Sequence, residues 1–72
     1  MHYSEYIIID SQIRFGKPCI KGTRITVYDV LNWMASGMSI ADILSDYPEL
    51  NQEQITACLS YAAERENKRR VA

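Results

Sequence analysis

A helix-start signature occurs three times between residues 26 and 54, and it constrains the fold more than any other feature of the chain. In each copy a Thr, Ser or Asn is followed three residues later by Asp or Gln, as in a capping box, where two side chains bond two free backbone amides. The three pairs are Thr26 with Asp29, Ser39 with Asp42, and Asn51 with Gln54. An apolar residue precedes each cap, and another stands at the fourth helical position. Because each cap contributes about 1 kcal/mol, three agreeing copies predict three helices.

The ends of these helices are also marked in the sequence. Gly37 suits the left-handed residue that follows many helices, and Pro48 cannot continue a helix. We therefore predict helices at residues 27–36, 40–47 and 52–65. Each has an apolar stripe at helical spacing, which predicts one core-facing side per helix. The stripes are Val27, Val30, Leu31 and Met34, then Ile40, Ile43 and Leu44, then Ile55, Cys58, Leu59 and Ala62.

The segment before the first helix has the pattern of a short β-arm. Residues 6–9 are aromatic or β-branched, which predicts a strand buried on both faces. Lys17 precedes Pro18 and is pushed towards an extended conformation, while Gly22 suits a turn with positive φ. We expect a hairpin or β-arm across residues 6–25. The predicted fold class is mainly α, a trihelical helix-turn-helix unit preceded by this short N-terminal arm.

The length of 72 residues predicts one small domain. A domain of this size buries only about 60% of its unfolded surface, so a second chain would add stability. We therefore expect a homodimer, formed through the arm and the first helix. Residues 1–66 are assigned to a single domain and residues 67–72 to a basic flexible tail.

Charges are segregated along the chain, although the formal net charge is only −1. Residues 1–26 are net positive, residues 27–66 are acidic, and residues 68–70 are basic. The cations of the first segment are Arg14, Lys17, Lys21 and Arg24. A basic, glycine-punctuated segment beside a helix start predicts an anion-binding surface, and phosphate is the usual anion. The Gly-Lys-Ser/Thr pattern of nucleotide-hydrolysing loops is missing, because Pro18 follows Gly16 and Lys17.

The sequence argues against catalysis. His2 is the single histidine, so a His-paired nucleophile cannot be assembled. Cys19 and Cys58 lie far apart and lack companions at zinc-ligand spacing, so we expect two reduced thiols. We predict a protein that is not an enzyme and has no metal and no cofactor. No apolar run is long enough for a membrane span or a secretion signal, so we expect a cytoplasmic protein with no membrane partner.

A short second helix, a brief turn and a longer third helix form the layout of helix-turn-helix DNA-binding domains. The candidate DNA-binding residues fall into two groups. Residues of the first group, on the arm, would contact DNA phosphates, and residues of the second, at the third helix, would contact base edges. They are Lys17, Lys21, Thr23, Arg24 and Thr26 for the first group, and Asn51, Gln52, Gln54 and Thr56 for the second. Glu49 and Glu53 place negative charge where phosphates would approach. The residues therefore leave DNA binding and protein docking both open.

The run Gly-Lys-Pro-Cys-Ile-Lys-Gly-Thr-Arg-Ile-Thr-Val, with Gly37-Met38-Ser39 and Asp46-Tyr47-Pro48-Glu49-Leu50, resembles a family of small prokaryotic proteins. These are the VapB-like antitoxins, which were first described only as a numbered domain of unknown function. The resemblance covers roughly residues 6–64. Its motif positions here are Gly16, Lys17, Pro18, Ile20, Gly22, Thr23 and Arg24.

The resemblance implies a homeodomain-like trihelical fold with a β-arm and a place in a type II toxin-antitoxin pair. The antitoxin would neutralise a PIN-like ribonuclease toxin and, as a dimer, bind its own operator DNA. Many antitoxins capture the toxin with a long C-terminal segment, whereas only a few residues follow the third predicted helix here. The expected toxin-binding surface is therefore on the folded domain.

Overall fold

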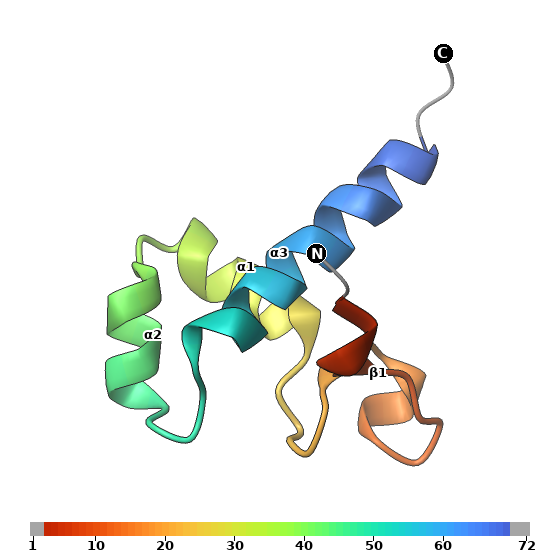
Figure 1. The fold of residues 1–72 in the computed structure, drawn as a ribbon, viewed down its shortest axis with the longest axis horizontal. Coiled ribbons are helices and arrows are strands. Elements are labelled where there is room, and N and C mark those ends of the chain that lie inside the picture. Colours follow the sequence, from red (N-terminus) through yellow and green to blue (C-terminus); the bar gives the residue numbers. More distant parts are fainter. Residues whose placement is uncertain (1–2, 70–72) are drawn as a thin grey trace.

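Residues 3–69, the part of the chain that a computed structural model describes, form three α-helices and one two-stranded antiparallel sheet (Figure 1). Side chains are described for residues 3–67. The helices are α1 (Val27–Ala35), α2 (Ile40–Asp46) and α3 (Gln52–Arg69), and the strands are β1 (Ile7–Ile8) and β2 (Cys19–Ile20). Short 3₁₀ turns precede each strand, at η1 (Tyr3–Glu5) and η2 (Arg14–Gly16). The mainly helical fold with a small β-arm is confirmed.

All three capping boxes form. At α1 the Thr26 hydroxyl accepts from the Asp29 amide at 2.8 Å, and the Asp29 carboxylate accepts from the Thr26 amide at 3.0 Å. Ser39 and Asp42 exchange the same bonds at 3.1 and 2.9 Å. Asn51 and Gln54 do so at 2.9 and 2.8 Å. Each box satisfies two backbone amides that a helix start leaves free, so the predicted starts of all three helices are confirmed.

The end of α1 forms around a glycine. Gly37 has φ +107°, and its amide bonds the Met34 carbonyl at 3.1 Å. The Met38 amide reaches back to the Trp33 carbonyl at 3.1 Å. These two bonds are the Schellman motif that satisfies the last carbonyls of a helix. The chain then turns sharply into α2, which lies at one end of the molecule (Figure 1).

The third helix is longer than the sequence predicts. It continues to Arg69, whereas the expected end is near residue 65. Residues 64–69 contain no Gly or Pro, and Glu, Arg and Lys are good helix formers, so nothing in the sequence stops the helix there. Residues 67–69, which the sequence assigns to the basic tail, thus continue the helix. The remaining predicted tail, residues 70–72, lies outside the described residues.

The core lies where the helices and β2 meet. Its buried side chains come from β2, all three helices and the α2–α3 turn: Ile20, Val27, Val30, Ile43, Leu50, Ile55 and Cys58. Ile25 and Met38, which precede two of the caps, pack against this cluster. The end of α1 is joined to the end of α2 by Trp33 and Tyr47, whose rings stack with centroids 4.6 Å apart. Burial of this apolar surface is the main stabilising term for so small a domain.

The arm is paired more briefly than predicted. In the sheet Ile7 faces Ile20 and Ile8 faces Cys19. Ile9 has already left the ladder and is 61% exposed, so the prediction of a strand buried on both faces is wrong at this residue. The cause is local, because Asp10 starts a turn in which its carboxylate accepts from the Gln12 amide at 2.9 Å.

Replacing Gly37 by alanine should destabilise the domain by about 1–2 kcal/mol, the cost of a left-handed residue with a Cβ. A Cβ there meets no atom within 4 Å, so backbone strain is the only penalty. Gly37→Asn should lose less, because asparagine tolerates this conformation. Urea unfolding of the three proteins measures the difference. Equal losses for alanine and asparagine would contradict the assigned role of this residue.

Candidate functional site

The segment from Gly16 to Ile25 folds as a rigid turn over the core. Ile20 is fully buried, and its amide bonds the Ile25 carbonyl at 2.8 Å. The Thr23 hydroxyl donates to the Ile20 carbonyl at 2.8 Å and accepts from the Ile25 amide at 3.0 Å. Gly22 provides the positive φ of +82° that the turn needs. Thr23 therefore contributes to the architecture of the turn, and the single hydrogen of its hydroxyl is already used there.

The two ends of this segment are fixed as well. Lys17 is extended, with φ −72° and ψ 145°, as predicted for a residue before proline. The Pro18 carbonyl accepts from the Val27 amide at 2.9 Å, and the Tyr6 carbonyl accepts from the Lys21 amide at 2.7 Å. Backbone bonds therefore tie the turn to β1 on one side and to α1 on the other.

Arg14 locks the arm onto the first helix. Its Nη1 atom donates to the Arg24 carbonyl at 2.9 Å and to the Asp29 carboxylate at 3.2 Å. The same Asp29 oxygen accepts from the amide of Thr26, which is buried. One guanidinium thus joins the arm, the basic turn and the cap of α1. Its positive charge is matched by Asp29, so Arg14 contributes little to the charge of the arm.

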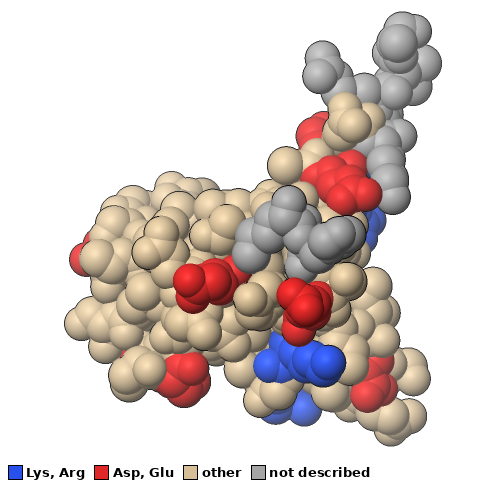
Figure 2. Space-filling model, viewed as in Figure 1, with Lys and Arg blue, Asp and Glu red and all other residues tan. Residues whose placement is uncertain are grey.

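Three other cations on the arm remain available to a partner. Lys17, Lys21 and Arg24 are exposed, and the described part of the chain gives none of their side chains a carboxylate partner. Basic side chains gather on the lower part of the face shown in Figure 2, with acidic side chains on either side of them. Held on a rigid turn, these cations form a candidate anion-binding site.

The predicted base-edge residues at α3 divide into two kinds. The side-chain oxygens of Asn51 and Gln54 are used by the capping box. Their amide NH₂ groups remain for a ligand, whereas each oxygen already accepts one bond and is less available to a base. Gln52 is exposed and Thr56 is half-buried. The start of α3 therefore offers fewer hydrogen-bonding groups to bases than the sequence suggests.

Acidic side chains surround this helix start. Four of them are exposed on α2, the α2–α3 turn and the first turn of α3: Asp42, Asp46, Glu49 and Glu53. Glu49 also lines an open recess of about 510 Å³ with the basic turn, opposite Arg24 and Ile25. The recess shows that the basic turn and the α2–α3 turn are neighbours on the surface. A partner that touches one of them meets both charges.

The chain offers little reactive chemistry in this region. Cys19 and Cys58 are both fully buried free thiols. Burial raises the pKa of the Cys58 thiol to about 12 and also raises the pKa of the Cys19 thiol. Among residues 3–69 no three His, Cys, Asp or Glu side chains come together as a metal site. Within the same residues, no helix has the length and apolar character to span a membrane.

A family model described as "Protein of unknown function (DUF433)" matches residues 7–62. The chain belongs to the DUF433 family. The match begins at β1 and ends within α3, so it contains the arm and the start of every helix. It includes the Arg14 lock and the three exposed cations of the turn.

Two relatives support the assignment. The uncharacterized protein y4eO of Sinorhizobium fredii is 36% identical over 58 residues, which are 81% of this chain and 26% of the relative. The crystal structure of a DUF433 member from Anabaena variabilis superposes with a TM-score of 0.82 at 25% identity. That alignment covers 88% of this chain and 62% of the other. The chain thus spans about a quarter of one relative and less than two thirds of the other.

The sequence does not predict the position of one exposed side chain in this DUF433 domain, that of Phe15. Phe15 is 95% exposed and lies in the left-handed region at φ 60°, ψ 32°. Arg14 before it and Gly16 after it also have positive φ, at 49° and 80°. A left-handed residue with a Cβ costs about 1–2 kcal/mol, so Arg14 and Phe15 are strained. The bonds of Arg14 account for its own conformation, whereas Phe15 gains no burial from the turn.

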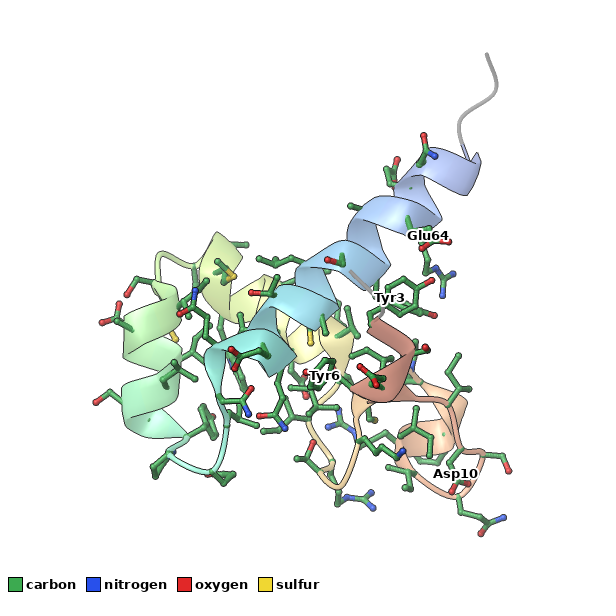
Figure 3. The ribbon with its side chains drawn as sticks, viewed as in Figure 1. Tyr3, Tyr6, Asp10 and Glu64 are labelled. Atoms are coloured by element: carbon green, nitrogen blue, oxygen red, sulfur yellow. The ribbon has the colours of Figure 1, made fainter. Side chains whose placement is uncertain are left out.

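The two sides of the domain differ in how far aromatic rings are covered. Tyr28 on α1 is 65% exposed. Tyr3 of η1 instead packs edge-on against Tyr61 of α3, with centroids 5.2 Å apart. Figure 3 shows Tyr3 beside α3 near Glu64, and Asp10 at the outer end of the arm. The contact at Tyr3 holds the N-terminal end of the arm on α3.

The cap of α2 should make stability depend on acid pH. Hydrogen bonds from Ser39, chiefly from its backbone amide, lower the pKa of Asp42 from the usual 3.8. A carboxyl with a lowered folded pKa contributes stability above its unfolded pKa and loses it as pH falls through the folded value. Asp42→Asn should therefore be less stable than the wild type at pH 7, and the difference should shrink as pH falls below the usual pKa of 3.8 and through the lowered folded pKa.

Urea unfolding at a series of pH values measures this difference. Asp46→Asn removes a charge from the same helix outside the capping box and is the matched control. A gap between wild type and Asp42→Asn that persists unchanged at low pH would contradict the assigned role.

Proposed function

We propose that this DUF433 domain is a non-catalytic antitoxin of a type II toxin-antitoxin pair. It neutralises a PIN-like ribonuclease toxin in the cytoplasm and, as a homodimer, binds its own operator DNA. The observation that carries the proposal is a set of three exposed cations on the turn that have no carboxylate partner among the described residues: Lys17, Lys21 and Arg24. The resemblance of the surrounding motif to VapB-like antitoxins supports it.

In the proposed complex the arm makes the main contacts with DNA. α2, the turn and α3 serve as a homeodomain-like helix-turn-helix unit, whose start of α3 lies near the major groove. The recess that joins Arg24 to Glu49 supports one continuous binding face. Lysine and arginine on the turn bind phosphates and so position the domain. Gln52, exposed at the start of α3, is the side chain best placed to meet a base edge.

The acidic side chains limit how DNA approaches. Asp42 and Asp46 on α2 repel phosphates, so the domain docks on the arm side and keeps α2 away from the duplex. The electrostatic part of the affinity then comes from few contacts and falls steeply with salt. Weak, salt-sensitive binding by each subunit is a further reason for the homodimer, which doubles the number of contacts.

The acidic surface also favours a second candidate function. A protein-interaction module that binds a basic partner through α2 and the α2–α3 turn needs no contact with DNA. Asp42, Asp46, Glu49 and Glu53 supply its charge. In that case the basic turn meets an acidic surface of the same partner.

Replacing Lys17, Lys21 and Arg24 with alanine tests the operator role. Each phosphate contact contributes about 0.9 to the slope of log affinity against log salt, so the triple variant should flatten the slope by about 2.7 per subunit. Binding should weaken on operator and unrelated DNA alike, because phosphate contacts carry no sequence information. Fluorescence anisotropy across a salt series measures both effects.

Arg65→Ala removes a cation from α3, outside the arm, and should leave the slope unchanged. Unchanged affinity and slope in the triple variant would remove the arm from the DNA-binding surface. Co-purification with the product of the neighbouring gene tests the toxin. A nuclease partner that is retained while no DNA shift occurs at low salt would select the protein-interaction module instead.

A further inference from the structure

The exposed aromatic ring of Phe15 has a matching feature elsewhere on the molecule. An open groove of about 370 Å³ lies between α1 and α3, beside the arm. Its apolar lining includes Pro18 from the arm, Tyr28 and Leu31 from α1, and Tyr61 and Ala62 from α3. Among the described residues, both the Phe15 ring and this groove are therefore left uncovered.

We propose that Phe15 of one copy inserts into the α1–α3 groove of a second copy, so that two chains lock together around a two-fold axis. This interface deepens the homodimer of the proposed function. In a two-fold interface each chain uses the same surface, so the Phe15 ring and the α1–α3 groove must be neighbours on that surface. They are, because Pro18 lines the groove and follows Phe15 by three residues.

Charge complementarity favours a second copy as the occupant. Lys17 is exposed two residues from Phe15, and Glu66 is exposed at the α3 end of the groove. Arg65 beside it is already engaged, since its Nη1 donates to the Tyr61 hydroxyl at 3.2 Å and its guanidinium lies 5.7 Å from that ring centre. An inserted Phe15 therefore brings Lys17 of one chain towards Glu66 of the other.

The exposed aromatic side chains supply much of the area that a stable dimer needs. Phe15 is 95% and Tyr28 65% exposed, so burying two of each removes on the order of 500–800 Å² from water. Stable interfaces begin near 1,200 Å² in total, so the proposed interface also includes the surfaces around the two arms. The strained conformation at Phe15 also has an explanation, because the turn aims the ring away from its own chain and towards the partner.

Sedimentation velocity of the full chain over a concentration series measures the dimer directly, without DNA or toxin. Phe15→Ala should raise the dimer dissociation constant at least tenfold. Ile9→Ala, which truncates another exposed apolar residue on the same arm, should change it less than threefold. Because Phe15 is almost fully exposed, Phe15→Ala should keep the wild-type circular dichroism spectrum. A monomeric wild type at 200 µM, or an unchanged dissociation constant for Phe15→Ala, would overturn the proposal.

A charge swap tests the partner contact. Lys17→Glu and Glu66→Lys should each weaken the dimer, and the double variant should recover most of the loss. No recovery would overturn the pairing of these two side chains across the interface.

A disulfide test locates the groove. A Phe15→Cys variant mixed with a differently tagged Tyr28→Cys variant should form a mixed disulfide faster than either variant alone, and the buried Cys19 and Cys58 do not compete. Equal or slower mixed cross-linking would overturn the insertion. A failed operator shift leaves all three tests intact, so the two proposals fail independently.

Discussion

The guanidinium of Arg14 is the contact on which the position of the arm depends. It crosses from the arm to two groups at once, the Arg24 carbonyl and the Asp29 carboxylate. Asp29 in turn completes the capping box of α1 with Thr26. A partly exposed ion pair alone contributes about 0–1 kcal/mol, so the importance of this one is geometric. It connects the helix start to the basic turn through one side chain.

The architecture of the basic segment separates two roles that the sequence presents together. Gly16, Gly22 and Thr23 shape the turn, while Ile20 anchors it in the core. The exposed cations stand between these residues and gain a fixed spacing from them. A family motif of this kind combines scaffold and binding groups, and only the cations are free for an anion. The proposed operator contact uses all three of these cations, and the proposed two-fold interface uses Phe15 and Lys17 of the same arm.

Signals within a few residues of each other predicted much of the fold. The caps at Thr26, Ser39 and Asn51 lie three positions from their partners, and Gly37 and Gly22 carry their own conformational signal. The sequence predicts these caps and glycine turns because each is stabilised by residues only a few positions apart. The sequence does not predict where α3 ends, because no residue there breaks a helix. The end is then decided by fraying of the last turns alone.

Local sequence patterns do not predict the contacts that define the candidate site. Arg14 and Asp29 are fifteen residues apart, and no local rule pairs them. Phe15 falls within the predicted β-arm, yet its backbone is left-handed and its side chain is exposed to solvent. The side-chain oxygens of Asn51 and Gln54 read equally well as caps and as base contacts, and only the observed hydrogen bonds assign them to the cap. Tertiary geometry decides each of these cases.

Amide hydrogen exchange of an Arg14→Ala variant tests the central claim, that this side chain holds the arm on the first helix. The amides of Ile20, Lys21 and Val27, which bond across the arm, should exchange at least tenfold faster than in the wild type. Amides in the middle of α3 should keep their protection, and Lys17→Ala, which breaks no described bond, should change neither set. Unchanged exchange across the arm, or an equal loss of protection throughout the domain, would contradict the account.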